Sequence, residues 1–436
     1  MCFSRSKKMI WCSLAPVALA YQSLLAQTTY MVRDLGSLTD LGGRSDSGPV
    51  GINRFGNVAG SNVTNGTYRA MIYTSSWRQL GTLGGVESLA GGINDSGWVV
   101  GNADTADGSP NAFVWNLGNT NGQPGNPQMM NLGTLGGPVS EAFSINVAGQ
   151  ITGYSDVLAK PNSQQHAFVY SGAKMQDIGA SLPQLPNSFG YAINNAGHVA
   201  GAAYDVANTA PHVFFFNGSA ATDLGTFGGL AATALALNDS DTIAGYFTTT
   251  NNLDRAFSYS GGKLTDLGSL GGDYSYARGI NNSNLIVGGS FVDNQNLVYH
   301  AFVWRGGVME DLNTLLDASG SGWSLTEARA VNEGGQITGV GLLSGVSHGF
   351  LLTPVSSNTN STPPVLSVLL GSDSKLVIQF VSVSGTSYTL QTNSSAANTG
   401  WANTGTVLTG TGGLVSVTNS TATSQSTFYR VEVSGP

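Results

Sequence analysis

Short apolar runs alternate with polar turns through most of the chain, and one combination of the two recurs. Its clearest copy spans residues 280–288: an apolar residue, an Asn, a polar turn, and a β-prone apolar run ending in Gly. A fixed period of this kind indicates a solenoid, a propeller or an array. Seven copies align on the apolar-Asn step, at Ile52-Asn53, Ile93-Asn94, Ile145-Asn146, Ile193-Asn194, Leu237-Asn238, Ile280-Asn281 and Val331-Asn332.

One period predicts four short strands. In the second copy these are Ser88–Ile93, Trp98–Gly101, Asn111–Trp115 and Met129–Leu132. The first two are joined by Asn94–Gly97, a turn composition. Helical periodicity is absent from the sequence, so no helix is expected. A four-stranded unit of roughly 40–50 residues is typical of a propeller blade.

The two ends of the array are complementary. Tyr30–Gly36 is strand-like and precedes the first copy, whereas the last copy stops after its third strand, His348–Leu352. The N-terminal strand can therefore complete the last blade and remove an open sheet edge. The fold class predicted is all-β: a seven-bladed β-propeller over residues 27–354, closed by the N-terminal strand.

The repeat ends at residue 354, and a second domain is expected beyond it. Residues 355–364 are a polar linker rich in Pro, Ser and Asn. Residues 365–436 contain β-prone stretches separated by polar turns, enough for a small β-sandwich near the lower size limit for independent folding. The stretches are Val365–Leu370, Leu376–Val381, Ser387–Thr392, Gly413–Thr418 and Phe428–Val433.

The first 26 residues have the order of a secretory signal peptide. Arg5, Lys7 and Lys8 precede the apolar run Met9–Ala20, and cleavage is expected after Ala20 or after Ala26. A membrane anchor is the alternative, but the run is short for a bilayer span. We therefore expect a protein that is secreted or held in the cell envelope, with no membrane span in the mature chain.

Composition supports an extracellular all-β protein. Charged residues are 10% of the chain, against roughly 25% in ordinary soluble proteins. Both cysteines, Cys2 and Cys12, lie in the signal segment, so the mature chain is expected to hold no disulfide and no thiolate metal site. Loss of that segment makes the chain three charges more negative than the formal −8, which argues against nucleic acid as a partner. We expect a monomer.

The first strand of each repeat unit suggests a binding site. The positions one and three before each apolar-Asn step are nearly all Gly, Ala or Ser, which allows close approach near a propeller axis. The intervening positions are large and variable, and they should lie at the mouth of the central channel, where they could bind a glycan or peptide. The alternative is packing between blades, with Arg278–Glu327 or Glu327–Arg329 as ion pairs. The candidate residues are Glu141, Phe143, Phe189, Tyr191, Tyr276, Arg278, Glu327 and Arg329.

The sequence gives weaker signals for metal binding and catalysis. Histidines 166, 212, 300 and 348 share one repeat position, so the ring should keep them apart, and a structural role at a strand start is expected. The Asn-Asp-Ser-Gly turns carry too few carboxylates for calcium loops. The sequence contains neither a Gly-x-Ser-x-Gly elbow nor a His-Glu-x-x-His motif. We expect no cofactor, no metal and no catalytic residue.

Two resemblances add context. The phrases His166-Ala167-Phe168 and His300-Ala301-Phe302, with Asp223-Leu224-Gly225 and Asp266-Leu267-Gly268, resemble the bacterial extracellular HAF-repeat family. That resemblance covers about three quarters of the chain and implies a secreted setting without a known reaction. The last 50 residues, with Tyr388–Thr392 and Phe428–Val431, look like a C-terminal module of secreted proteins from Verrucomicrobia-like bacteria.

Two functions are compatible with these features. The first is a non-catalytic secreted or surface protein that binds a glycan or protein through its loop face. The second is an extracellular polysaccharide hydrolase or lyase, which needs paired carboxylates near the channel mouth. Glu141 and Glu327 are its only candidates.

Overall fold

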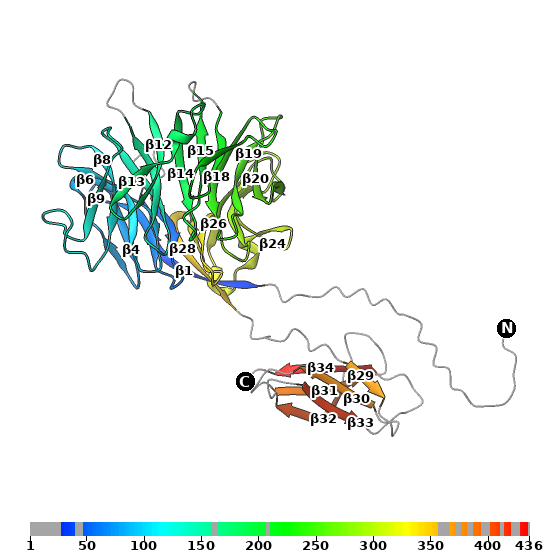
Figure 1. Cartoon of the computed structure of the whole chain (residues 1–436). Helices are drawn as coiled ribbons and strands as arrows, with labels where there is room; N and C mark the ends of the chain where they lie inside the picture. Colours follow the sequence, from blue (N-terminus) through cyan, green and yellow to red (C-terminus); the bar gives the residue numbers. More distant parts are fainter. Residues whose placement is uncertain are drawn as a thin grey trace, which may run out of the picture. The chain divides into compact units, whose positions relative to one another are not determined.

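The computed structural model describes residues 28–39, 47–157, 164–205 and 210–355, together with six strands between residues 367 and 434 (Figure 1). The expected signal peptide, residues 1–26, lies outside the described residues. So does the expected linker, 355–364, apart from its first residue. Among the described residues no helix is long and apolar enough to cross a membrane.

Residues Thr29–Val355 form seven antiparallel four-stranded sheets. In six of them the strands follow chain order from the channel outward, and in the seventh β1 (Thr29–Ser37) is the outer strand. This confirms the seven-bladed propeller. Blade 1 consists of β2 Gly48–Ile52, β3 Val58–Thr64, β4 Thr67–Tyr73 and β5 Trp77–Gln79. Blade 2 consists of β6 Gly84–Ile93, β7 Val99–Thr105, β8 Pro110–Trp115 and β9 Met129–Gly133. Blade 3 consists of β10 Ser140–Ile145, β11 Ile151–Asp156, β12 Gln165–Ser171 and β13 Lys174–Asp177. Blade 4 consists of β14 Asn187–Ile193, β15 Val199–Tyr204, β16 His212–Phe216 and β17 Ala221–Gly225. Blade 5 consists of β18 Ala231–Leu237, β19 Ile243–Thr248, β20 Asp254–Ser260 and β21 Lys263–Gly268. Blade 6 is β22 Ser275–Ile280, β23 Ile286–Phe291, β24 Tyr299–Arg305 and β25 Val308–Asp311.

Blade 7 combines the two ends of the array. Its inner three strands are β26 Trp323–Val331, β27 Ile337–Leu343 and β28 Val346–Val355, and its outer strand is β1 Thr29–Ser37. β1 pairs antiparallel with β28 from Thr29 opposite Val355 to Ser37 opposite His348. Figure 1 shows the blue β1 beside the yellow β28. The predicted closure by the N-terminal strand is confirmed.

Three short 3-10 turns interrupt the strands of the described region, at η1 Gly179–Ser181, η2 Leu312–Leu315 and η3 Ala318–Gly320. Each is too short to present an amphipathic face, so the propeller is all-β as expected. The core lies between blades, because each hydrophobic cluster draws on neighbouring sheets. In six of the seven blades the third strand contributes one fully buried phenylalanine to this core. These residues are Phe113, Phe168, Phe214, Phe257, Phe302 and Phe350.

The repeated Asn of the apolar-Asn step joins neighbouring blades. In blade 2, Asn94 Oδ1 accepts hydrogen bonds from the backbone of Ser96 and Trp98, which closes the turn as expected. Its Nδ2 reaches across to blade 3 and donates to the carbonyl of Asn146 at 3.1 Å. All seven copies make the cross-blade bond, the last one from Asn332 to the carbonyl of Asn53, so the bonds form a closed ring.

The glycine that ends each repeated phrase faces a β-bulge. In every blade the register between the first two strands shifts by one residue, for example between Ala142 and Ser144, so that Phe143 is the bulged residue. A bulge re-aims its side chain. The glycine opposite has no room for a side chain, since a Cβ on Gly153 would lie 1.8 Å from the carbonyl oxygen of Glu141. The same carbonyl contact recurs at Gly60, Gly101, Gly201, Gly245, Gly288 and Gly339.

The C-terminal strands form two three-stranded antiparallel sheets, β29–β30–β33 and β32–β31–β34. Their bounds are β29 Ser367–Leu370, β30 Leu376–Val381, β31 Ser387–Asn393, β32 Ala402–Thr409, β33 Leu414–Asn419 and β34 Phe428–Ser434. Five of them coincide with predicted stretches. β32 was not predicted, because its polar residues and Gly405 hide the apolar alternation. That the two sheets pack face to face as a sandwich stays a prediction.

Candidate functional site: the channel mouth

The propeller axis contains three successive cavities that share lining residues. The largest, about 440 Å³, lies at the end of the channel where the first strand of each blade begins. A second of about 220 Å³ follows, and a third of about 200 Å³ lies at the ring of Asn side chains. Only the first falls within the size range of small-molecule sites, roughly 300–1,000 Å³. We refer to it as the mouth cavity.

The mouth cavity is lined by the bulged residue of every blade. These seven residues are Val50, Gly91, Phe143, Tyr191, Leu235, Arg278 and Arg329. The bulge therefore explains why a variable residue lies between small ones along the first strand: it turns that residue toward the channel, and in every blade except blade 2, which has Gly91, the residue brings a side chain with it.

Six of the eight predicted site residues line this cavity: Glu141, Phe143, Tyr191, Arg278, Glu327 and Arg329. The other two do not. Phe189 packs instead on Tyr204, with ring centroids 5.7 Å apart. Tyr276 packs on Tyr246 and donates a hydrogen bond to Asp254 Oδ2 at 2.9 Å. Both occupy the repeat position of Glu141 and Glu327, and aromatic partners on the second strands hold them away.

One side of the mouth cavity, on blades 6 and 7, carries a three-residue charge cluster. Glu327 accepts from Arg278 Nε and from Arg329 Nε, each at 2.9 Å. Both ion pairs expected from the sequence are thus present together. Burial alone would raise the pKa of Glu327, but the two guanidinium groups outweigh it and hold that pKa below its usual range. Glu327 therefore stays ionised and is unsuited to act as a general acid.

Tyr299 is a half-buried tyrosine near this cluster that was not predicted. Gly289 leaves the space it needs, because a Cβ there would lie 2.4 Å from the Tyr299 hydroxyl. Burial, and then the charge of Glu327, raise the pKa of Tyr299, so the phenol stays protonated. The only sequence signal is a Gly-Gly pair where other copies carry a side chain.

The other side, on blades 3 and 4, is aromatic. The rings of Phe143 and Tyr191 lie 5.1 Å apart, and Phe189 and Tyr154 pack behind them with centroids 5.0 Å apart. Burial raises the pKa of the Tyr154 hydroxyl, and the negative charge of Glu141, to which it is hydrogen-bonded, adds to the effect. Aromatic rings with a few fixed polar groups are typical of ligand sites.

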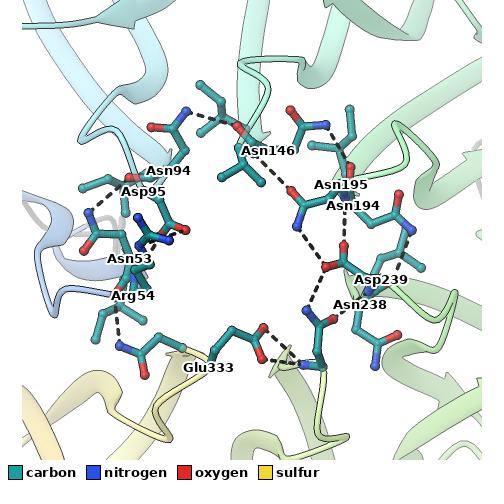
Figure 2. Close-up of a pocket in the computed structure, with 18 of the residues that line it drawn as sticks. Asn53, Arg54, Asn94, Asp95, Asn146, Asn194, Asn195, Asn238, Asp239 and Glu333 are labelled. Carbon is teal, nitrogen blue, oxygen red and sulfur yellow. Dashed lines mark hydrogen bonds and ion pairs between the residues drawn. The ribbon is translucent and has the colours of Figure 1, made fainter.

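The opposite end of the channel has a different character. Figure 2 shows the Asn side chains around the opening, with Asp95, Asp239 and Glu333 among the residues next to them. The Asp239 carboxylate accepts from the backbone N–H of Asn195 at 2.9 Å, a second bond between blades. Burial, and the nearby charges of Asp239 and Asp95, raise the pKa of Glu333. These groups therefore mainly join blades.

Four of the five histidines pair with aspartates inside their own blades, whereas His198 Nδ1 lies 2.8 Å from Asp241 Oδ1 of the next blade. His166 Nδ1 lies 2.8 Å from Asp177 Oδ2, linking the third strand to the fourth, and His348 makes the same contact with Asp34 of β1. His212–Asp223 and His300–Asp311 repeat it. These four contacts link neighbouring strands, in keeping with the structural role expected, and they give the His-Ala-Phe and Asp-Leu-Gly phrases a common physical basis. Among the described residues no group of three or more His, Cys, Asp or Glu side chains could hold a metal ion.

Comparison with known proteins supplies no family name. No protein-family model matches the chain, and no curated protein matches it. Similar solved structures include a puromycin-hydrolyzing peptidase of Mycobacterium tuberculosis (10% identity, TM-score 0.46, covering 77% of this chain and 57% of that one). An acylaminoacyl peptidase of Pyrococcus horikoshii has 10% identity and TM-score 0.42 over 80% of this chain and 58% of its own.

A mutant of AofleA from Arthrobotrys oligospora has 13% identity and TM-score 0.34, over 65% of this chain and 88% of its own. The chain spans less than two thirds of the length of the two peptidases. At these TM-scores the similarities carry no argument about function. The HAF-repeat resemblance therefore stays a prediction.

Proposed function

We propose that this is an exported, HAF-like repeat protein that binds a glycan or protein ligand in the mouth cavity and does not catalyse a reaction. The proposal rests on one observation: the bulges of blades 3, 4, 6 and 7 direct the aromatic pair, Phe143 and Tyr191, and both arginines of the charge cluster into a single cavity of about 440 Å³. A propeller core requires no such residues at these positions, since blades 1, 2 and 5 carry Val50, Gly91 and Leu235 there.

The hydrolase or lyase alternative is weaker. It requires one carboxyl group that can hold a proton and a second that remains ionised. Glu327 is ionised and bound to two arginines, so it is not available as the acid. Glu141 lies on the opposite side of the mouth cavity, next to Tyr154.

Binding of the full-length protein to glycan and protein panels tests the proposal. We expect at least one ligand class to bind, and Tyr191→Ala to weaken that binding at least tenfold, because the ring forms part of the cavity wall. Tyr259→Ala is the matched control, since Tyr259 packs on Phe227 in blade 5, outside the lining of the mouth cavity. Binding unaffected by Tyr191→Ala would contradict the proposal.

A further inference from the structure

The two sides of the mouth cavity differ in the chemistry they offer a ligand. The aromatic pair Phe143 and Tyr191 belongs to blades 3 and 4, and Arg278 and Arg329 belong to blades 6 and 7. Blade 5 lies between the two pairs on one side of the ring, and blades 1 and 2 lie between them on the other. A ligand in the cavity therefore meets aromatic faces on one side and guanidinium groups on the other.

Arg278 presents a fixed anion-binding group. Its Nε is held by Glu327 at 2.9 Å, and its guanidinium lies 5.8 Å from the centre of the Tyr276 ring. Its side chain is 38% exposed, and the part of the chain that the structure describes gives its terminal nitrogens no hydrogen-bond acceptor. Terminal guanidinium N–H groups match a carboxylate, and a side chain already held in place loses little entropy on binding.

Arg329 contributes a positive charge, but its guanidinium is less available to a ligand than that of Arg278. Its Nε binds Glu327, and its Nη1 donates to the carbonyl of Ser47 at 3.2 Å. The cluster of Arg278, Arg329 and Glu327 thus carries one net positive charge. This suits one carboxylate rather than a polyanion, and Glu141 on the opposite side of the cavity disfavours a second negative group.

The aromatic side suits a flat, partly apolar ring. Phe143 and Tyr191 are half-buried, and Phe189, Tyr154 and Tyr204 pack against the pair or behind it. This support fixes the two rings, so a ligand ring can bury its apolar face on them without ordering loose side chains.

We infer that the mouth cavity binds the end of an acidic glycan, with the carboxylate of a terminal uronic acid on Arg278 and its sugar ring against Phe143 and Tyr191. The inference rests on the proposed function. It is favoured over an extended peptide because the site is a cavity enclosed by seven strands, with its only charged groups set into the wall, rather than a groove along a strand edge.

Isothermal titration of the full-length protein tests the inference with two oligosaccharides that differ only at the terminal residue, glucuronic acid or glucose. We expect the acidic compound to bind at least about tenfold more tightly, as for a charge-assisted hydrogen bond. Arg278→Gln should remove that difference. Arg305→Gln is the matched control, because Arg305 pairs with Glu310 at 2.6 Å in the same blade, away from the cavity lining.

The outcomes separate the inference from the proposed function. Equal affinity of the wild type for both oligosaccharides overturns the inference without relying on any variant being folded. A neutral glycan or a peptide whose binding requires Tyr191 but not Arg278 overturns the inference and leaves the proposed function intact. Acid-specific binding that survives both Arg278→Gln and Tyr191→Ala would place the ligand outside the mouth cavity. It would overturn the inference and the proposed function together.

Discussion

At the scale of single residues, one Asn per repeat performs two tasks. Asn94 is 5% exposed, and its side chain closes a turn through two backbone bonds and joins the next blade through a third. Most buried polar groups in proteins have a hydrogen-bond partner, because an unpaired one costs free energy. The identity of the residue is therefore set by both the turn and the neighbouring blade.

Asn94→Asp separates the two tasks. The substitution keeps the acceptor used in the turn but places a carboxylate oxygen against the Asn146 carbonyl, so we expect a loss of about 2–4 kcal/mol in the free energy of unfolding. Chemical denaturation measures it. Asn217→Asp is the control, because Asn217 accepts bonds from Ser219 and Ala220 in an exposed turn. Equal effects of the two substitutions would refute the inter-blade role.

The hydrogen bonds of Asp177, one of them to His166, give stability a pH dependence. Burial would raise the pKa of Asp177, but hydrogen bonds from His166 and the backbone of Ala180 outweigh it, so the folded-state pKa lies below 3.8. A depressed carboxyl pKa contributes stability that is full above the unfolded-state value and is lost as pH falls through the folded-state value. We expect the stability difference between the wild type and Asp177→Asn to shrink below about pH 4 in thermal unfolding. A difference independent of pH from 2 to 7 would contradict this.

At the scale of strands, the bulge and its glycine act as a unit. The bulge turns one residue of the first strand into the channel, and the glycine of the second strand accommodates the displaced carbonyl. Structure and candidate site thus depend on the same local irregularity. The site can vary from blade to blade because the glycine, and not the bulged residue, carries the steric requirement.

Gly153→Ala should therefore destabilise the propeller strongly. The added Cβ would lie 1.8 Å from the Glu141 carbonyl oxygen, and relief requires backbone movement, so we expect a loss of about 3 kcal/mol or more. The control is Gly118→Ala, whose nearest neighbour would be Asn116 Oδ1 at 3.6 Å. Denaturant midpoints of both variants test this. A Gly153→Ala protein as stable as the control would show that the bulge does not need glycine.

The sequence predicted the blades well because each strand shows its own apolar pattern and each turn its own chemistry. Six of the eight residues predicted at the channel mouth line the cavity, because small and large positions alternate along the first strand. The sequence misplaced Phe189 and Tyr276, whose orientation is set by Tyr204 and Tyr246 on second strands. It also could not find the Asn ring, since a side chain bonded to a backbone carbonyl some 41 to 52 residues away leaves no local pattern.

At the scale of the whole molecule, the ring closes in two ways. β1 completes blade 7 along its outer edge, and the Asn332 bond to Asn53 closes the inner ring. The His348–Asp34 pair adds a polar contact to the β1 junction. The first and last parts of the propeller are thus joined twice, at the outer edge of blade 7 and at the inner ring of Asn side chains.

Removing the chain through Ser37 should expose the edge of β28 and leave blade 7 incomplete. We expect this truncation to unfold at a lower temperature than the intact protein and to self-associate in sedimentation experiments, because an open strand edge pairs with other chains. A truncation that stops before Thr29 keeps β1 and serves as the control. A monomeric protein that retains the wild-type melting temperature after loss of β1 would be inconsistent with this closure.

The proposal that the mouth cavity is the ligand site is tested most directly by hydrogen–deuterium exchange with and without a bound ligand. We predict added protection in the first strands of blades 3, 4, 6 and 7, at residues 140–145, 187–193, 275–280 and 323–331, which carry the aromatic pair and the charge cluster. The fourth strands of the same blades should be unchanged. Protection confined to the fourth strands or to the C-terminal strands, with these four segments unaffected, would contradict the proposed site.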